Sequence, residues 1–206
     1  MIYTDIKTSA LVYADRVGDA ELTSARLDSF LRIVEARINR SLNTQPMNLS
    51  VIIPSVPDQL SYQLPDGWLI VRNVVRRDAS ATSGTVLASI NLEQMNNART
   101  NKSSNSYYYI TESSLHVHPL LADTEVLDIA YTSRLVPLSS INIENPIAKY
   151  NPDCYIFGLL VEISSFVKDT TAIQFWDTRF KEALNEISAQ DMSATWAGVP
   201  LQVRLG

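Results

Sequence analysis

The chain has little of what marks several common protein classes. Its 206 residues include a single cysteine, Cys154, which excludes an internal disulfide framework and fits a reducing compartment. No apolar run approaches the roughly 20 residues that cross a bilayer, and the N-terminus lacks the basic and apolar regions of a signal peptide. The net charge of -5 lacks the basic excess typical of nucleic-acid-binding proteins. We therefore expect a soluble protein that is made in the cytoplasm.

The motifs of common catalytic sites are also missing: the chain has no P-loop, GxGxxG, GxSxG or paired-carboxylate signature. His116 and His118 alternate as on a strand, but no local carboxylate or thiol completes a metal site, so ordinary strand residues are favoured. Cys154 stands in the first turn of an expected helix, where a thiol pKa falls, yet no histidine is near it in sequence, which favours a buried apolar role. Tyr107–Tyr109 lack the basic neighbours of a single-strand nucleic-acid site and predict packing in a sheet. We expect no enzymatic activity, no cofactor and no metal.

What the chain does have is a helical pattern at each end. Residues 172–189 carry one apolar stripe, and Asp177 with Lys181 makes an i,i+4 ion pair on the other face. The preceding segment, 152–168, is apolar almost all round, and Asn151 followed by Pro152 marks its start. A helix that is apolar on every side needs other helices to cover it. The stripe of the last helix consists of Ile173, Trp176, Phe180, Leu184 and Ile187.

Two further helices are predicted at the N-terminus, from Thr4 or Asp5 to about Gly18 and from Leu22 to Leu42. Asp28 and Arg32 are placed to form an i,i+4 pair on the second. The arginines of this second helix could form a stripe that faces phosphate groups or a partner. The other interpretation, an ordinary solvated helix surface, is favoured. These arginines are Arg26, Arg32, Arg37 and Arg40. The core of the four helices is expected to contain Leu31, Val34, Ile38, Phe157, Leu160, Trp176, Phe180 and Leu184.

The middle of the chain changes to a strand-like period. Short β-like runs are separated by prolines, by Asp66-Gly67 and by a polar loop at 101–106, while 92–99 is either helical or irregular. Six or seven short strands predict an antiparallel sandwich or small barrel. Residues 137–150 are expected to form a connection with little periodicity. The runs are 47–53, 60–64, 68–76, 84–90, 107–111, 115–118 and 125–133.

The predicted fold is therefore α+β: a four-helix bundle with this antiparallel β domain inserted between its second and third helices. The bundle is expected to comprise 1–46 and 147–189, and the β domain 47–146. Residues 190–206 are expected to form an extended C-terminal arm, which must fold back or dock on a partner because it carries large apolar residues. These residues are Trp196, Val199, Leu201, Val203 and Leu205.

Over most of its length the chain resembles the head-to-tail adaptor (connector) proteins of tailed bacteriophages, because several short motifs occur in the same order as in that family. Residues 30–40 contain Glu-Ala-Arg-Ile-Asn-Arg, similar to that family's second helix. Residues 64–69 are similar to its leucine-proline-x-aromatic strand entry, although Gly-Trp replaces the more common Asp-Phe. Each motif is modest alone, and their order makes the resemblance specific. The remaining matches are Tyr109-Ile110 with Leu115, Val117 and Pro119; Ile129-Ala130-Tyr131; Asn145-Pro146-Ile147; Asn151 to Tyr155; and Trp176, Phe180, Ala183 and Leu184.

The resemblance implies a structural virion protein of the neck, made in the host cytoplasm. Such adaptors form a ring, typically of twelve copies, that docks beneath the portal and extends the DNA channel towards the tail. It further implies that the arm, 190–206, engages the portal protein. The β domain would face tail proteins such as the nozzle, tail tube or fibres. DNA would pass through the lumen without sequence-specific binding, and no membrane is involved.

Three alternatives stay open from the residues. The β domain, with Trp68 and the tyrosines, could be a tail-associated module that binds a receptor or a glycan. A hydrolase could use His116 or His118. The C-terminal arm could pack back on its own bundle instead of docking on a partner.

Overall fold

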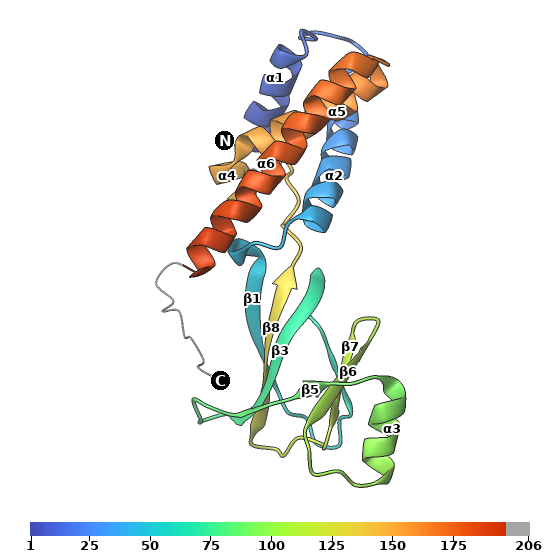
Figure 1. The fold of residues 1–206 in the computed structure, drawn as a ribbon, viewed down its shortest axis with the longest axis vertical. Helices are drawn as coiled ribbons and strands as arrows, with labels where there is room; N and C mark the ends of the chain where they lie inside the picture. Colours follow the sequence, from blue (N-terminus) through green and yellow to red (C-terminus); the bar gives the residue numbers. More distant parts are fainter. Residues whose placement is uncertain (197–206) are drawn as a thin grey trace, which may run out of the picture. The chain divides into compact units, whose positions relative to one another are not determined.

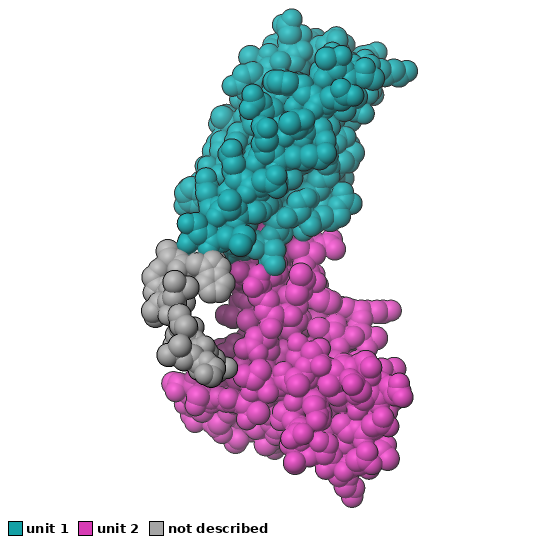
Figure 2. Space-filling view, viewed as in Figure 1, with its two compact units in different colours: residues 1–46, 135–206 teal, residues 47–134 magenta. Residues whose placement is uncertain are grey.

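The computed structural model describes residues 1–196, which fall into two compact units. One unit combines residues 1–46 with the chain from 135 onward, and the other is residues 47–134 (Figure 2). The second unit is thus inserted into the first. The structure groups 135–146, which the sequence placed with the β domain, with the helical unit because Leu135 and Leu138 are buried there.

The fold class is α+β, as predicted. The described residues form six α-helices, one 3-10 helix and two sheets of four strands each (Figure 1). Two of these helices are additional to the four that the sequence predicted: one lies inside the inserted unit and one precedes the third predicted helix. In chain order the elements are α1 (Tyr3–Tyr13), α2 (Ser24–Ser41), η1 (Gln45–Met47), β1 (Asn48–Pro54), β2 (Ser61–Gln63), β3 (Trp68–Asp78), β4 (Thr85–Val86), β5 (Ala88–Ser89), α3 (Leu92–Thr100), β6 (Tyr107–Thr111), β7 (Ser114–His118), β8 (Glu125–Ser133), α4 (Pro146–Tyr150), α5 (Pro152–Phe166) and α6 (Thr170–Trp196).

Helix α5 is the centre of the helical unit, because α1, α2, α4 and α6 all contact it (Figure 1). Nine of its 15 residues are buried, which is the structural reason for its apolar composition on every side. Helices α2 and α5 approach closely at Gly158, whose absent Cβ would lie 2.5 Å from Val34 Cγ1. The helix that other helices cover from all sides therefore organises this unit.

Three helix boundaries differ from the sequence prediction. Helix α1 ends at Tyr13 and does not reach Gly18. Residues 146–150, expected to belong to an irregular connection, form α4, whose first turn is capped by Asn145 Oδ1 accepting a hydrogen bond from Ala148 N at 2.9 Å. Helix α6 continues to Trp196, so 190–196 are helical and not part of an extended arm.

The inserted unit contains sheets with the strand orders β1-β8-β3-β4 and β2-β7-β6-β5. All pairings are antiparallel except that of β5 with β6, which is parallel. The expectation of a wholly antiparallel domain is therefore wrong at this edge. The predicted strand at 84–90 is also divided: β4 pairs with β3 in one sheet, and β5 pairs with β6 in the other.

One hydrophobic cluster joins both sheets of the inserted unit. The alternating residues Leu127, Ile129 and Tyr131 of β8 face the same cluster as Leu115 and Val117 of β7. The cluster also includes one buried side chain from each of three more strands: Tyr62 of β2, Val74 of β3 and Tyr108 of β6. This shared core makes the inserted unit a domain with its own interior.

Candidate docking site on the helical unit

The residues predicted for the helical core lie on α2, α5 and α6. Six of them are buried: Leu31, Val34, Ile38, Leu160, Phe180 and Leu184. Phe157 and Trp176 are half-buried and stack on each other across α5 and α6, with ring centroids 5.8 Å apart. The aromatic pair lies at the edge of the helix interface, where large rings cover the interior.

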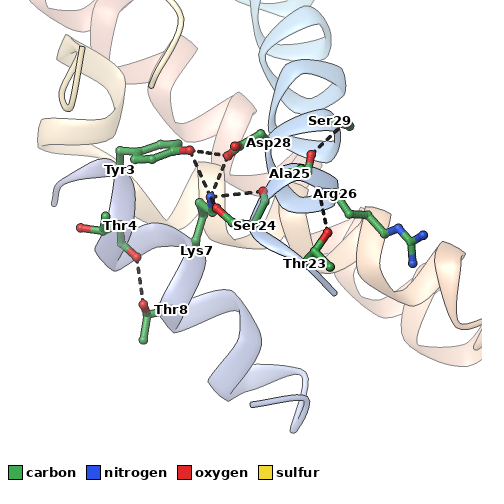
Figure 3. Close-up of polar contacts among 10 residues, drawn as sticks. All are labelled: Tyr3, Thr4, Lys7, Thr8, Thr23, Ser24, Ala25, Arg26, Asp28 and Ser29. Atoms are coloured by element: carbon green, nitrogen blue, oxygen red, sulfur yellow. Dashed lines mark hydrogen bonds and ion pairs between the residues drawn. The ribbon is translucent and has the colours of Figure 1, made fainter. Parts of the chain in front are cut away.

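A polar cluster fixes α1 to α2 (Figure 3). Lys7, only 8% exposed, donates to Asp28 Oδ1 at 2.7 Å and to Ser24 Oγ at 2.7 Å. The hydroxyl of Tyr3 donates to the same carboxylate. Burial alone would lower the pKa of Lys7, but its hydrogen bonds to Asp28 and Tyr3 outweigh burial and raise it. Asp28 thus forms its ion pair with α1 and not with Arg32, the partner that the sequence predicted.

Arg37 joins α2 to the other two long helices. Its guanidinium lies 2.6 Å from Asp177 Oδ1 on α6 and 3.4 Å from Glu162 Oε1 on α5, and it covers the ring of Phe180 at 4.8 Å. The predicted pair of Asp177 with Lys181 is also present, at 2.7 Å. Hydrogen bonds from Lys181 and Arg37 keep the pKa of Asp177 below its usual value despite partial burial. Arg37 is therefore part of the helix packing and not of a free basic surface.

Replacing Arg37 with alanine is expected to destabilise the protein by about 1–2 kcal/mol, because two partly buried carboxylates lose their shared cation. Urea unfolding of the whole chain measures this cost. Arg179→Ala is the matched control, since Arg179 pairs with Glu182 on the exposed surface of α6. Its cost should stay below about 0.5 kcal/mol. Equal effects of the two substitutions would contradict the role assigned to Arg37.

A buried carboxylate holds the segment that returns from the inserted unit. Glu35, 5% exposed, accepts a hydrogen bond from the backbone N–H of Leu138 at 2.6 Å. One turn further along α2, Asn39 Oδ1 accepts from Leu135 N at 2.9 Å. Burial raises the pKa of Glu35 to about 7, although the Leu138 hydrogen bond and the nearby Arg32 oppose the shift. Sequence reasoning missed this residue; its only signal is an acid directly beside the apolar stripe of α2.

An open groove lies at the C-terminal end of α6. Its volume is about 510 Å³, and it is lined by α4, by α6 and by the segment between α2 and β1. The backbone N–H of Gln45 donates to Asp191 Oδ1 at 2.7 Å, which ties that segment to α6 beside the groove. The predicted docking residue Trp196 ends α6, and Val199, Leu201, Val203 and Leu205 lie outside the described residues. The groove thus adjoins the predicted arm, because Gln190, Asp191 and Ala194 form part of its lining.

Each histidine of the inserted unit has a partner within that unit. His116 stacks on Tyr109 with ring centroids 4.4 Å apart, and His118 Nε2 lies 3.1 Å from the carbonyl oxygen of Ser103. Burial, helped by Arg99, lowers the pKa of His116. Within residues 1–196, no group of three or more His, Cys, Asp or Glu side chains is arranged to hold a metal ion. Trp68 packs against the sheet core.

Cys154 is fully buried in the first turn of α5. Burial, together with the neighbouring Asp153, raises the pKa of its thiol to about 12. A thiol with this pKa remains protonated at neutral pH and packs as a small apolar group.

Comparison with known proteins gives one result for the whole chain. The family model described as SU10 adaptor protein matches residues 1–204, which include both units and nearly all of the C-terminal segment. No curated protein matches significantly. Among the helices that the structure describes, none has the length and apolarity needed to cross a membrane.

Proposed function

Because the chain belongs to the SU10 adaptor protein family, a family of phage head-to-tail adaptors, we propose that it forms a ring beneath the portal. This ring extends the DNA channel and provides the attachment site for the tail. The observation that carries the proposal is the extent of the family match, 1–204, since a shared motif or a single shared unit would cover less of the chain. The protein is then a structural component of the virion neck, made in the host cytoplasm, without enzymatic activity.

The portal-docking element in this proposal is the C-terminal segment after residue 190. Its first part is helical, and α6 ends at Trp196. The following Val199, Leu201, Val203 and Leu205 are apolar, and the last three alternate in the sequence. Alternating apolar residues suit addition of a strand or insertion into pockets of a partner.

The remaining partners are assigned to the two units. The helical unit, whose four long helices we regard as a four-helix bundle, packs against copies of itself in a ring of about twelve, as the adaptor family implies. The inserted unit, which we regard as a sandwich-like domain around its shared core, contacts tail proteins such as the nozzle, tail tube or fibres. Genomic DNA passes through the lumen, and the net charge of -5 is compatible with weak phosphate contact.

The mass of the purified protein, alone and after mixing with its cognate portal ring, tests this function. A ring-sized co-complex that forms only with portal is expected. A protein that ignores the portal but closes its own ring would instead be another ring component of the tail. A monomer in both conditions would contradict the adaptor function.

Charged residues at the apolar positions of the terminal segment should weaken portal attachment. Leu201→Asp combined with Leu205→Asp is expected to weaken portal binding at least 100-fold, because each buried leucine contributes about 2 kcal/mol. Gln202→Asp is the control, since it adds one of these two negative charges at a position of the opposite parity, and it should bind within about threefold of the unsubstituted protein. Native mass spectrometry of the portal mixture reports both. Equal loss in all variants would show that charge, and not the apolar positions, governs docking.

One observation supports a second candidate function, a tail-associated module that binds a receptor or glycan. A groove of about 500 Å³ on the inserted unit is lined by the amide side chains of Gln94, Asn97 and Asn101 and by Tyr107. Amide groups beside an aromatic ring offer the polar and apolar contacts that a sugar uses. Binding in a glycan screen by a protein that ignores the portal would favour this alternative.

A further inference from the structure

The groove at the end of α6 contains a buried hydroxyl that lacks a partner. Thr44 is 3% exposed, and its Oγ1 forms no hydrogen bond within the part of the chain that the structure describes. Thr44 also lines the groove. A buried hydroxyl without a partner costs about 1–3 kcal/mol, and native structures rarely leave one unpaired. Thr44 thus places a polar atom in the wall of the groove for which the described chain supplies no partner.

The rest of the lining combines apolar and polar side chains. Ile147 of α4 and Ile187 of α6 contribute aliphatic surface, and Pro46 and Pro146 contribute rings without N–H groups. Tyr150, 73% exposed, stands at the rim. An extended peptide fits such a site, because its alternate side chains enter the apolar surface while its backbone offers N–H and C=O groups.

The nearest segment with this chemistry is the chain's own C-terminus. Ala194 lines the groove and precedes the last residue of α6 by two positions. Ten residues follow, and among them Gly198 and Pro200 are turn formers that can reverse the chain. Leu201, Val203 and Leu205 then alternate in the sequence.

Length and charge agree with this occupant. Along α6 the groove extends from Ile187 to Ala194. With a rise of about 1.5 Å per helical residue, this length is about 10 Å. Three or four residues of an extended peptide span the same length. Residues 201–206 are therefore sufficient. Arg204 is the single charged residue of 197–206, and the carboxylate of Asp191 lies on the groove lining. The pair is complementary in charge.

We propose that the groove formed by α4, α6 and Thr44–Pro46 is an intramolecular binding site for residues 197–206. The same leucines that are proposed to bind the portal are then held by the chain's own helical unit before assembly. Docking on the portal requires their release, so the site keeps the terminal segment covered until a ring is available. The intramolecular contact itself does not depend on the portal function.

The test uses the chain truncated after Trp196 and a synthetic peptide of residues 197–206, without portal. The peptide should bind the truncated chain saturably in calorimetry. It should bind the full-length chain at least tenfold more weakly, because the tethered segment competes at an effective concentration of about millimolar. Failure of the peptide to bind the truncated chain would overturn the proposal.

Two substitutions on α6 make the test specific. Ala194→Glu in the groove should weaken peptide binding to the truncated chain at least tenfold, whereas Ala189→Glu, an exposed position outside the lining, should leave it unchanged. Thermal unfolding of both variants checks that the helical unit remains folded. Equal affinities of the two variants would place the peptide elsewhere and contradict the assignment.

Two other occupants give different results. If the segment binds the groove of a second copy, the full-length chain self-associates with rising concentration, and the truncated chain does not. If the groove binds only a portal segment, peptide 197–206 fails to bind while portal attachment of the full-length chain persists. That last result overturns the intramolecular site and leaves the adaptor function intact, whereas loss of portal attachment alone affects only the adaptor function.

Discussion

Glu35→Gln is expected to stabilise the protein above pH 7 by about 2–3 kcal/mol. The glutamine amide oxygen can still accept the hydrogen bond from Leu138 N, and it carries no charge into a site that is 5% exposed. The difference between the ordinary glutamate pKa of 4.5 and the value of about 7 in the folded protein corresponds to about 3 kcal/mol. Unfolding in urea between pH 5 and 8.5 measures the gain.

The sign follows from the direction of the pKa shift. The folded protein holds the Glu35 proton more tightly than the unfolded chain, so the stability due to this group is complete below pH 4.5. It falls as the pH rises through about 7 and is then fully lost. Glu35→Gln removes this slope, so its advantage should be small near pH 5 and constant above about pH 8. The other groups near Glu35 are Arg32 on its own helix and the Tyr155 hydroxyl on α5.

Two controls separate the charge from the hydrogen bond. Glu186→Gln changes an exposed residue of α6 and should leave the pH dependence as it is. Glu35→Ala removes the acceptor as well as the charge, so it should be about 1–3 kcal/mol less stable than Glu35→Gln at every pH, because the Leu138 N–H is then unpaired. If Glu35→Gln unfolds with the same pH dependence as the unsubstituted protein, the buried carboxylate is not the titrating group.

The periodic parts of this fold could be predicted from the sequence. Helices α2, α5 and α6 were predicted because each has at least 15 residues, which is long enough for the arrangement of its apolar residues to be recognised. The order of helices, strands and again helices indicated a β insertion, since a change of period from 3.6 to 2 marks a change of structure. The family resemblance rested on the same ordered segments, and the family assignment is confirmed by the match over 1–204.

The parts that were missed depend on contacts between distant residues. Helix α4 has five residues, too few for a helical period to appear. The divided strand at 84–90 depends on which neighbour each half pairs with, and no local pattern specifies a parallel pairing with β6. The pairing of Asp28 with Lys7 rather than Arg32 requires α1 to lie beside α2.

The groove was equally inaccessible to sequence reasoning. Its lining joins residues near 45, 147 and 190, and the first of these regions is more than a hundred positions from both others. The unpaired hydroxyl of Thr44 has no sequence signature, since most threonines lie at the surface. Only the apolar terminal segment was recognisable, and its site required the structure.

The close approach of α2 and α5 leads to the second large effect. In an ordinary helix, Gly→Ala stabilises by about 1 kcal/mol. At Gly158, however, a Cβ would lie 2.5 Å and 3.1 Å from the two methyl groups of Val34 and 3.2 Å from Phe180 Cε2. Val34 and Phe180 are fully or almost fully buried and cannot move away freely. Gly158→Ala is therefore expected to destabilise the protein by about 2 kcal/mol.

A double-mutant cycle with Val34→Ala identifies this contact as the cause. Val34→Ala alone should cost about 2 kcal/mol because it leaves a cavity, but it also makes room for the new methyl group at 158. The double variant should be at least 1 kcal/mol more stable than the sum of the single effects predicts, in urea unfolding. Ser165→Ala, an exposed change on the same helix, controls for helix propensity and should be near neutral. A stabilised Gly158→Ala variant would show that α2 and α5 are further apart than the structure has them, because the ordinary helix preference would then exceed the cost of the contact.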